Sequence, residues 1–354
     1  MKPFDSKYIA VEAFRQSKRK PDFDNLVKIC RREKPSRPTL FEFGASRQIN
    51  EALTAGIEYD PNDPLTHLKK TADAYRLAGY DYVAMGGSGF GFPTNRKHDG
   101  IAKTYSQNDG VTIYDWESYE KYEWPDPESY DYSALEKIAP FLDGMKVVVM
   151  DPFGVLEIVI DLMGYENMCY ALADEPELVK VMFDQVGSRL VKYHEICARY
   201  ETVGAHLFGD DWGFNSQTSM SHKHMRQYVL PWHKKEAQAV HAAGKIAILH
   251  SCGQLGELME DVIEDLRYDA KHSFEDNIQP IEEAYKQYGG RIALLGGVDV
   301  DFLCRSTPEE VYRRSVALLE ATGGKGYALG SGNSIPDYVP MENYLAMQAA
   351  AVFA

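Results

Sequence analysis

Residues 245–255, KIAILHSCGQL, begin with an apolar run that predicts a strand over 245–251. The preceding residues 221–243 carry apolar side chains at helical spacing, and Gly244 follows them as a helix end commonly has it. A helix followed at once by a strand that is apolar on both faces is typical of a parallel sheet covered by helices. This unit predicts an α/β protein.

The same alternation extends in both directions along the chain. Helical spacing recurs over residues 175–200, and eight β-rich runs predict strands: 39–44, 81–87, 146–151, 205–211, 245–251, 268–273, 291–297 and 326–331. Eight strands separated by helices predict a closed (β/α)8 TIM barrel. An open doubly wound sheet is the alternative, but its glycine loop has one candidate, GGSGFG (86–91), which lacks the G-x-G-x-x-G order.

We expect residues 1–354 to form a single barrel domain with two additions. Residues 1–36 precede the first predicted strand as an N-terminal helical extension. Residues 105–132 interrupt the alternation and are rich in Tyr, Trp, Asp and Glu. We expect this insertion to be a lid or a subunit interface, and an interface would make the protein a homodimer.

Charge and cysteine content narrow the class of protein. A formal net charge of −15 argues against a nucleic-acid surface, which needs clustered Lys and Arg. Residues 1–20 lack the apolar core of a secretory signal, and no run reaches the ~18–20 apolar residues of a membrane span. The five cysteines are scattered and odd in number, which argues against a disulfide framework. We therefore expect a cytoplasmic protein.

His250 lies at the end of the strand predicted over 245–251, and Cys252 comes directly after it. Barrel enzymes carry their chemistry on the loops after the strands, and side chains two residues apart on extended chain point to the same face. An imidazole beside a thiolate is a pairing that selects zinc or a related metal. The alternative is a small buried cysteine and a histidine that caps a loop.

Other polar residues follow other predicted strands. The pair Asp210 and Asp211, before Trp212, would bind a metal or a cationic group, act as a general base, or cap a turn. The turn over residues 330–340 would hold an anion. The strand ends and this turn thus offer Asp211, Asp299 and Glu42 as candidates for catalysis, His250 and Cys252 as candidates for metal ligation, and Asp210, Trp212, Ser331, Asn333 and Tyr338 as candidates for substrate binding.

Several of these motifs, in this order, resemble the uroporphyrinogen decarboxylase superfamily. They are PFGVLEIVIDLMGYENMCYALADEPELV (152–179), ILHSCG (248–253), LLGGVD (294–299) and GYALGSGNSIPDYVPMENYLAM (326–347). The resemblance implies a (β/α)8 barrel and one of two activities. The decarboxylases act on uroporphyrinogen without a cofactor, whereas the corrinoid-linked methyltransferases use zinc to activate a thiol.

The details of the resemblance favour the methyltransferases. Decarboxylases have an arginine-rich N-terminal loop and an aspartate after the second strand, but here FEFGASRQINEAL (41–53) has Arg47 alone and AMGGSG (84–89) has no acid. In LHSCG, the resemblance makes His250 and Cys252 two of three zinc ligands. Asn333 stands where the family's third cysteine is expected, so Asp211, Asp299 or Glu42 would complete the site.

The resemblance thus implies a zinc-dependent methyltransferase that acts with a corrinoid protein and a small-molecule methyl donor or acceptor. Uroporphyrinogen decarboxylase is the alternative enzyme. A third possibility is a non-catalytic barrel that binds a tetrapyrrole or corrinoid, because the third thiolate is lost.

Overall fold

Seven parallel strands form one sheet in the computed structural model, which describes residues 3–95 and 106–353. Their spatial order is their chain order, β1 to β7, so each strand pairs with the next one along the chain. This order is typical of a sheet that curls towards a barrel. The strands are Tyr82–Gly86 (β1), Lys146–Met150 (β2), Val203–Gly209 (β3), Ile246–His250 (β4), Ala270–His272 (β5), Ala293–Leu295 (β6) and Tyr327–Ala328 (β7).

The first predicted strand, 39–44, makes one isolated parallel bridge instead of a ladder. Leu40 pairs with Leu329, just after β7. The backbone of Leu329 exchanges hydrogen bonds with the neighbours of Leu40: its carbonyl oxygen accepts from the N–H of Phe41, and its N–H donates to the carbonyl oxygen of Thr39. On its other side this segment meets β1 through a side chain, because the Tyr82 hydroxyl both donates to the carbonyl oxygen of Glu42 and accepts from its N–H, each at 2.7 Å. The described residues therefore form a parallel sheet of seven strands that is covered by helices, whereas the sequence predicts eight strands.

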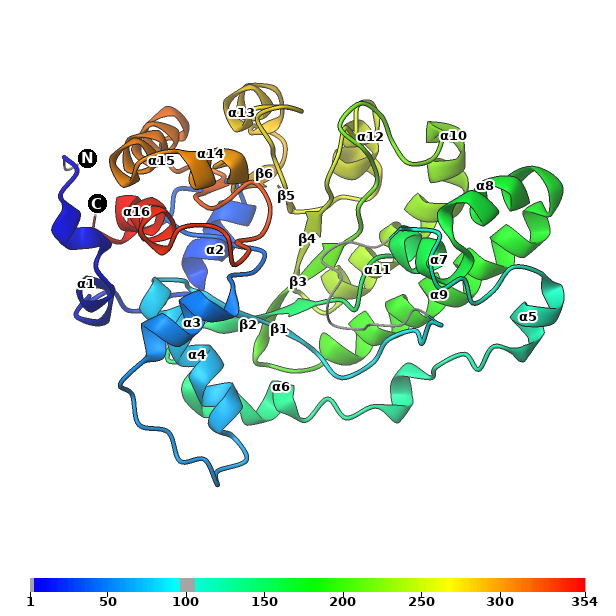
Figure 1. Ribbon diagram of the computed structural model, residues 1–354, viewed down its shortest axis with the longest axis horizontal. Helices are drawn as coiled ribbons and strands as arrows, with labels where there is room; N and C mark the ends of the chain where they lie inside the picture. Colours follow the sequence, from blue (N-terminus) through cyan, green and yellow to red (C-terminus); the bar gives the residue numbers. More distant parts are fainter. Residues whose placement is uncertain (1–2, 96–105, 354) are drawn as a thin grey trace.

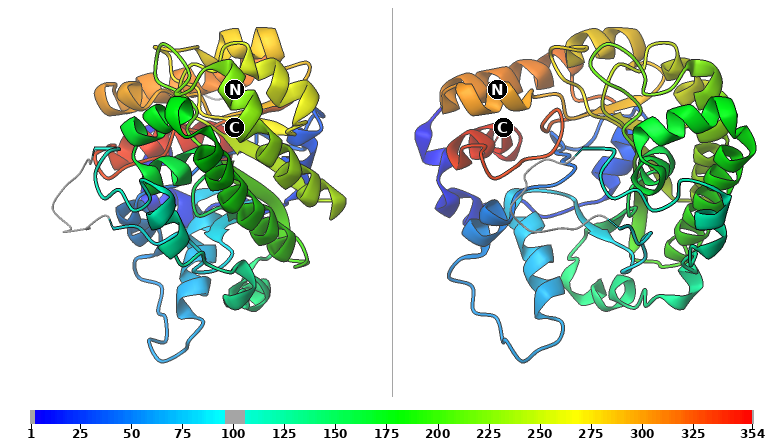
Figure 2. Two further views of the ribbon diagram at one scale, coloured as in Figure 1. Left: turned by 90° about the vertical axis from the view of Figure 1, so that its right-hand side faces the viewer. Right: turned by 45° about the vertical axis from the view of Figure 1, so that its right-hand side comes forward.

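Helices cover the outside of the curved sheet (Figures 1 and 2). The α-helices are Val11–Arg15 (α1), Asp24–Cys30 (α2), Arg47–Thr54 (α3), Thr66–Ala78 (α4), Trp116–Lys121 (α5), Ala134–Lys137 (α6), Val155–Met163 (α7), Tyr165–Asp174 (α8), Pro176–Cys197 (α9), His222–His224 (α10), Leu230–Ala242 (α11), Leu258–Glu260 (α12), Ile281–Tyr288 (α13), Val300–Arg305 (α14), Pro308–Thr322 (α15) and Met341–Val352 (α16). Short 3-10 helices are Ser6–Ile9 (η1), Pro127–Ser129 (η2) and Ala139–Phe141 (η3), and π-helical turns are Met225–Val229 (η4) and Asp261–Asp265 (η5).

The helices predicted at 175–200 and 221–243 are present. The first is α9, and the second is α10, η4 and α11 in succession, so that a π-helical turn interrupts the expected α-helix. Pro231 lies just after the π-helical turn, and because proline has no N–H to donate and its ring crowds the preceding turn, a regular α-helix is disfavoured at this point. The spacing of apolar residues thus predicted the helical span 221–243, but it did not predict the change from α-helical to π-helical hydrogen bonding at Met225–Val229.

The two segments that we expected outside the barrel are short helices and irregular chain. The N-terminal extension contains η1, α1 and α2, and Tyr8 stacks on Phe353 near the other end of the chain, with ring centroids 4.8 Å apart. Residues 106–132 of the insertion contain α5 and η2, while residue 105 lies outside the described residues. The use of the insertion as a lid or a subunit interface stays a prediction.

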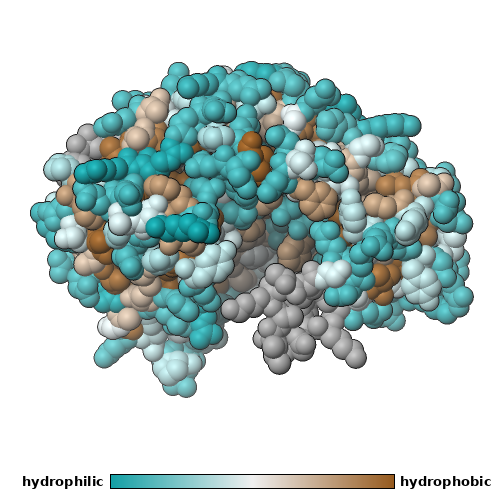
Figure 3. All heavy atoms as spheres, turned by 45° about the horizontal axis from the view of Figure 1, so that its top comes forward, coloured by the Kyte–Doolittle hydropathy of each residue, from teal (hydrophilic) through white to brown (hydrophobic). Residues whose placement is uncertain are grey.

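The face of the molecule shown in Figure 3 is mainly hydrophilic, with hydrophobic residues in separate patches. Within residues 3–95 and 106–353, the helices are all too short or too polar to cross a lipid bilayer.

Candidate metal centre

The register of the sheet places two histidines side by side. His250 ends β4 and pairs with His272, which ends β5. Both side chains are almost completely buried, at 5% and 0% exposure. Their Nδ1 atoms are 2.7 Å apart, and the rings are stacked with centroids 5.0 Å apart. The sequence placed His272 at a predicted strand end but gave no reason to assign it a role.

Three potential ligand atoms meet just beyond β3 and β4. Cys252 Sγ lies 3.6 Å from His250 Nε2, and Asp211 Oδ1 lies 3.8 Å from the same nitrogen. All three atoms are within 4.8 Å of one another. A tetrahedral zinc ion with bonds of about 2.0–2.3 Å separates its ligand atoms by roughly 3.3–3.8 Å. The donor set and its spacing therefore fit a zinc ion.

The turn that carries Cys252 depends on a glycine and on Asp211. The Cys252 N–H donates to Asp211 Oδ1 at 2.9 Å, which holds the two side chains together. Gly253 has a φ of +91°, and a Cβ there would lie 2.2 Å from the backbone oxygen of Gly213. A side chain at residue 253 would therefore force apart the loops after β3 and β4.

Hydrogen bonding assigns the tautomer of each histidine. His272 Nε2 faces the carbonyl oxygen of Ser331 at 3.3 Å, so this nitrogen carries the proton. Burial is the main cause that lowers the pKa of His272 to about 3 and holds the pKa of His250 well below its usual value, so both rings are neutral. Nδ1 of His272 must then accept from Nδ1 of His250. The lone pair of His250 Nε2 is consequently directed towards Cys252 and Asp211.

Two donors contact the Cys252 sulfur. Asn333 Nδ2 lies 3.2 Å from Sγ, and the Ser273 hydroxyl donates to it at 3.4 Å. Ser273 has a φ of +82°, which is unusual for a residue other than glycine and indicates backbone strain at this position. Burial, followed by repulsion from Asp211, raises the pKa of the Cys252 thiol. The thiol therefore keeps its proton until a cation is nearby.

Glu42 supports the loop that carries Asn333. Its buried carboxyl group accepts hydrogen bonds from Ser331 N at 3.1 Å and Ser331 Oγ at 2.7 Å. Burial raises the pKa of Glu42 to about 8. Its neighbour Phe43 stacks on His250 with centroids 4.0 Å apart and an interplanar angle of 17°. Glu42 thus binds Ser331, two residues before Asn333, whereas Phe43 packs against His250, one of the potential metal ligands.

Gly330 explains the Gly-Ser-Gly sequence in this loop. A Cβ at Gly330 would lie 1.7 Å from the carbonyl oxygen of Phe41, so only glycine allows the loop to pack against the segment that carries Glu42.

Asp210 and Trp212 lie within the protein scaffold, both at 0% exposure. The Asp210 carboxylate accepts from the N–H groups of Leu156 and Glu157 at 3.1 and 3.0 Å, which caps the N-terminus of α7. It also accepts from Trp212 Nε1 at 3.0 Å and contacts His233 Nε2 at 2.8 Å. These contacts occupy both oxygens, so the geometry shows a structural role, and substrate binding stays a prediction.

Asp299 and Tyr338 are not part of the cluster of potential metal ligands. Asp299 is the N-cap of α14 and accepts hydrogen bonds from the N–H groups of Asp301 and Phe302. Tyr338 is 72% exposed on the loop before α16. Asp211, Asp299 and Glu42 are the three acids proposed to complete the site. Of these, Asp211 lies beside His250 and Cys252.

Lys271 is a buried charge that the sequence did not single out. Its ammonium group donates to the carbonyl oxygens of Ser251, His272 and Ser273, all next to the ligand-bearing turns. Burial lowers the pKa of Lys271 to about 8. The sequence did not predict that Lys271 holds these turns, because a lysine within a strand is ordinarily expected to point to the surface.

A cavity of about 560 Å³ lies beside the centre. Ser273, which donates to the Cys252 sulfur, lines it, and so does Glu275, whose Oε1 lies 3.4 Å from Asn333 Nδ2. The walls combine apolar residues such as Phe274 with glutamates and glutamines. Its size suits a small-molecule ligand, for which pockets of about 300–1,000 Å³ are typical.

The fold is shared with a known protein structure of similar length. The chain is similar in structure to a methyltransferase from Methanosarcina mazei, with a TM-score of 0.64 and 15% identity over 92% of this chain and 96% of that one. A β-1,4-D-mannanase from Cryptopygus antarcticus is more distant, with a TM-score of 0.42 and 11% identity over 90% of this chain and 91% of that one. No curated protein sequence matches the chain. The family model described as uroporphyrinogen decarboxylase (URO-D) matches residues 109–352, and the chain therefore belongs to the URO-D family.

Proposed function

We propose that this chain is a zinc-dependent methyltransferase that acts with a corrinoid protein. The observation that supports the proposal most directly is the convergence of Cys252 Sγ, His250 Nε2 and Asp211 Oδ1 within 4.8 Å. A thiolate, a neutral imidazole and a carboxylate are all zinc ligands, and three protein ligands leave a fourth position for substrate. The likeness to the Methanosarcina mazei methyltransferase supports the fold on which this site is built.

The protein residues have distinct tasks in this proposal. His250 presents an unprotonated nitrogen because its other nitrogen donates to His272. Cys252 loses its proton on metal binding, and Asn333 and Ser273 donate to the sulfur and steady it. Zinc, when bound, supplies Lewis acidity that lowers the pKa of a coordinated thiol acceptor. Asn333 replaces the third thiolate that the resemblance leads us to expect.

The small-molecule methyl donor or acceptor is proposed to enter from the cavity of about 560 Å³ beside Ser273. A corrinoid protein would present its methyl group at the same face, where the loops after the strands meet. We place the acceptor thiol next to Cys252 and His250, and Phe43, which stacks on His250, keeps that ring in position.

Uroporphyrinogen decarboxylase is the second candidate function because the matching family model carries that description. The segment expected to grip the substrate's carboxylates argues against it. Arg47 is its sole arginine and forms an ion pair with Glu51 on α3 at 2.8 Å, while Glu42 is buried and uses its oxygens on Ser331. A non-catalytic corrinoid carrier is the third candidate, favoured by the amide at residue 333.

Metal analysis tests the proposal. Purified protein incubated with zinc and then desalted should retain about one equivalent of zinc, and the variant Cys252→Ala should lose most of it. Cys169→Ala is the matched control, because Cys169 is an exposed free cysteine on α8. Zinc retained equally by all three proteins, or by none, would show that the centre does not bind zinc as proposed.

An activity assay separates the three candidates. Zinc-loaded protein should demethylate methylcobalamin in the presence of a thiol, seen as a change in the corrinoid absorbance, and Cys252→Ala should be at least ~100-fold slower. Formation of coproporphyrinogen from uroporphyrinogen would instead identify a decarboxylase. A corrinoid spectral shift without turnover would identify a carrier.

A further inference from the structure

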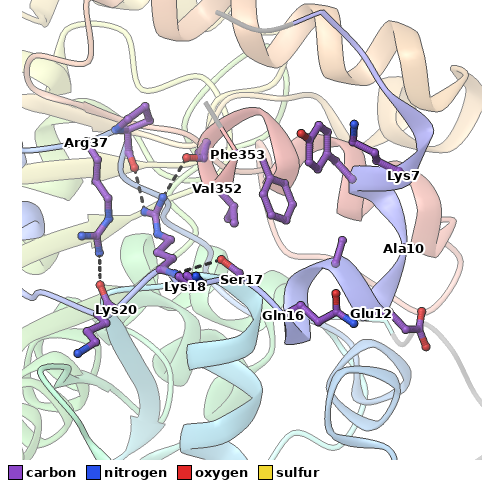
Figure 4. Close-up of a pocket in the computed structure, with 15 residues that line it drawn as sticks. Lys7, Ala10, Glu12, Gln16, Ser17, Lys18, Lys20, Arg37, Val352 and Phe353 are labelled. Carbon is purple, nitrogen blue, oxygen red and sulfur yellow. Dashed lines mark hydrogen bonds between the residues drawn. The ribbon is translucent and has the colours of Figure 1, made fainter.

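A second cavity, of about 860 Å³, lies between the N-terminal extension and the end of α16 (Figure 4). We call it the terminal cavity. Its walls come from residues between Lys7 and Lys20 of the N-terminal extension, from Arg37 and Pro38, and from the chain at the end of α16. Pro38 and the nearby Asp81 precede the strand positions that begin at 39 and 82, whereas His250 is the last residue of β4 and Cys252 follows it. The terminal cavity is therefore at the opposite end of the sheet from the metal centre.

The charge of the terminal cavity is opposite to that of the whole chain. Two arginines and three lysines line it, against one acidic residue, Glu12, among the described residues. Lys7 already pairs with Asp5 at 2.6 Å. The other four cations are Lys18, Arg19, Lys20 and Arg37, and three of them are consecutive in the chain. In a chain with a net charge of −15, this local excess favours an anionic ligand.

Two of these cations share one buried carboxylate. Asp81 is completely buried and forms ion pairs with both Arg37 and Arg19. The Arg19 side chain is 6% exposed, and its terminal nitrogens donate to the carbonyl oxygens of Ala351 and Pro38, each at 2.9 Å. One carboxylate faces two guanidinium groups, so these three side chains together carry a net positive charge, and Arg37, at 26% exposure, keeps part of that charge accessible to a ligand.

The arginines also leave hydrogen-bonding capacity unused. Nε of Arg19 and Nε of Arg37 are buried without a hydrogen-bond partner among the residues that the structure describes. Burial lowers the pKa of Arg19 to about 10, which still leaves it charged at neutral pH. A buried donor without a partner is rare, and a small local shift would let these groups contribute to binding an anion.

The other wall of the terminal cavity is apolar and aromatic. Tyr8 stacks on Phe353 with centroids 4.8 Å apart and an interplanar angle of 24°, and Val352 and Ala10 line the cavity as well. Figure 4 shows Phe353 and Val352 on one side, with Lys18, Lys20 and Arg37 on the other. A ligand that fills this space would place an anionic group against the cations and an apolar body against the rings.

We propose that the terminal cavity binds the phosphate group of a small ligand. A phosphate has more acceptor oxygens and more negative charge than a carboxylate, so it matches two guanidinium groups, two exposed lysines and the Ser17 hydroxyl better. Binding would join the N-terminal extension to the end of α16. This site is separate from the proposed methyl transfer and does not depend on it.

Titration calorimetry on the full chain tests the proposal with inorganic phosphate, phenyl phosphate and benzoate, each against chloride at equal ionic strength. Phosphate should bind and benzoate should bind at least ~10-fold more weakly than phenyl phosphate. Tighter binding of phenyl phosphate than of inorganic phosphate would identify a phosphate ester as the ligand type, and equal binding would identify free phosphate. Benzoate binding as tightly as phenyl phosphate, or phosphate binding no better than chloride, would overturn the proposal.

Variants locate the binding in the terminal cavity. Lys18→Gln/Lys20→Gln changes two exposed residues, so the fold should persist, and it should weaken phosphate binding at least ~10-fold. Lys70→Gln is the matched control, because Lys70 is exposed on α4 and does not line the cavity. Phosphate affinity should be unchanged in Cys252→Ala. Equal affinity in the double lysine variant and the control would refute the assignment.

Discussion

Nδ1 of His250 and Nδ1 of His272 are 2.7 Å apart, and this contact determines which nitrogen of His250 is available to a metal. His272 can only accept there because its Nε2 proton is used on the carbonyl oxygen of Ser331. The chain Ser331–His272–His250 therefore ends in an unprotonated Nε2 beside Cys252. A partner that fixes the tautomer of a ligating histidine typically affects metal affinity about 10–100-fold.

Replacing His272 tests this relay. His272→Phe keeps an aromatic ring in the buried position but removes the acceptor for His250 Nδ1, so we expect zinc affinity to fall about 10–100-fold. Competition with a chelating zinc indicator measures the change. His67→Phe, at an exposed position of α4, is the control and should bind zinc normally. Unchanged affinity in His272→Phe would show that the relay does not set the tautomer.

The amide at residue 333 gives a second prediction. Asn333 Nδ2 lies 3.2 Å from Cys252 Sγ, so a thiol at residue 333 would lie close to the ligand cluster. We expect Asn333→Cys to bind zinc at least ~10-fold more tightly under reducing conditions, because a second thiolate joins the donor set. Ser334→Cys places the same group one residue further along and serves as control. A gain in both variants would mean that the position of the thiol is immaterial.

The sequence predicted the ligand-bearing turns better than the roles of the acids. His250 ends an apolar strand and Cys252 follows it, as the sequence indicated, and seven of the eight predicted strands are present. Asp210 and Asp211 are adjacent in the chain, yet one caps α7 and the other lies beside Cys252. Adjacent side chains at a strand end point in different directions, and the partners of each come from distant segments, so sequence alone did not separate them.

The missing first strand has a similar cause. Residues 39–44 are apolar enough for a strand, but the neighbour that should pair with them meets them through the Tyr82 hydroxyl instead of a backbone ladder. The sequence did not indicate roles for Phe43 and Ser273. Phe43 stacks on His250, and Ser273 donates to Cys252, and both contacts join residues that are far apart in the chain and meet only in the folded structure. Asp299 looked functional after a double glycine, a pattern that an N-cap also explains.

A second pair of histidines predicts acid sensitivity. His194 and His206 are completely buried, with their Nδ1 atoms 2.9 Å apart, and within residues 3–95 and 106–353 neither Nε2 has a hydrogen-bond partner. Burial holds the pKa of His194 well below its usual value and lowers the pKa of His206 to about 3. Below pH ~6.5 the unfolded chain takes up protons that the folded chain refuses, so stability falls as the pH falls towards 3.

Urea unfolding at pH 6.5 and 4.5 checks this expectation. The wild type should lose about 2–3 kcal/mol per titrating histidine over this interval. The double variant His194→Leu/His206→Leu should lose less, because the pair no longer titrates and both polar groups are removed together. An equal pH dependence in the two proteins would contradict the assignment of this pair as an acid-labile element.

Glu42 gives the last prediction, and the sign of its pH dependence is opposite. Its pKa is raised to about 8 by burial, so the folded chain holds a proton that the unfolded chain releases above pH ~4.5. The stabilising contribution is complete below pH 4.5 and is lost as the pH rises through 8. Glu42→Gln removes the titration, so its stability relative to wild type should increase by about 1 kcal/mol per pH unit between pH 5.5 and 7.5. Glu42→Leu instead leaves the buried N–H of Ser331 without its acceptor, while the Ser331 hydroxyl keeps the carbonyl oxygen of Asn333 at 2.9 Å, and the change should cost about 1–3 kcal/mol. Urea unfolding of the three proteins at both pH values separates these effects, and a Gln variant that tracks the wild type across the interval would show that Glu42 is ionised in the folded protein.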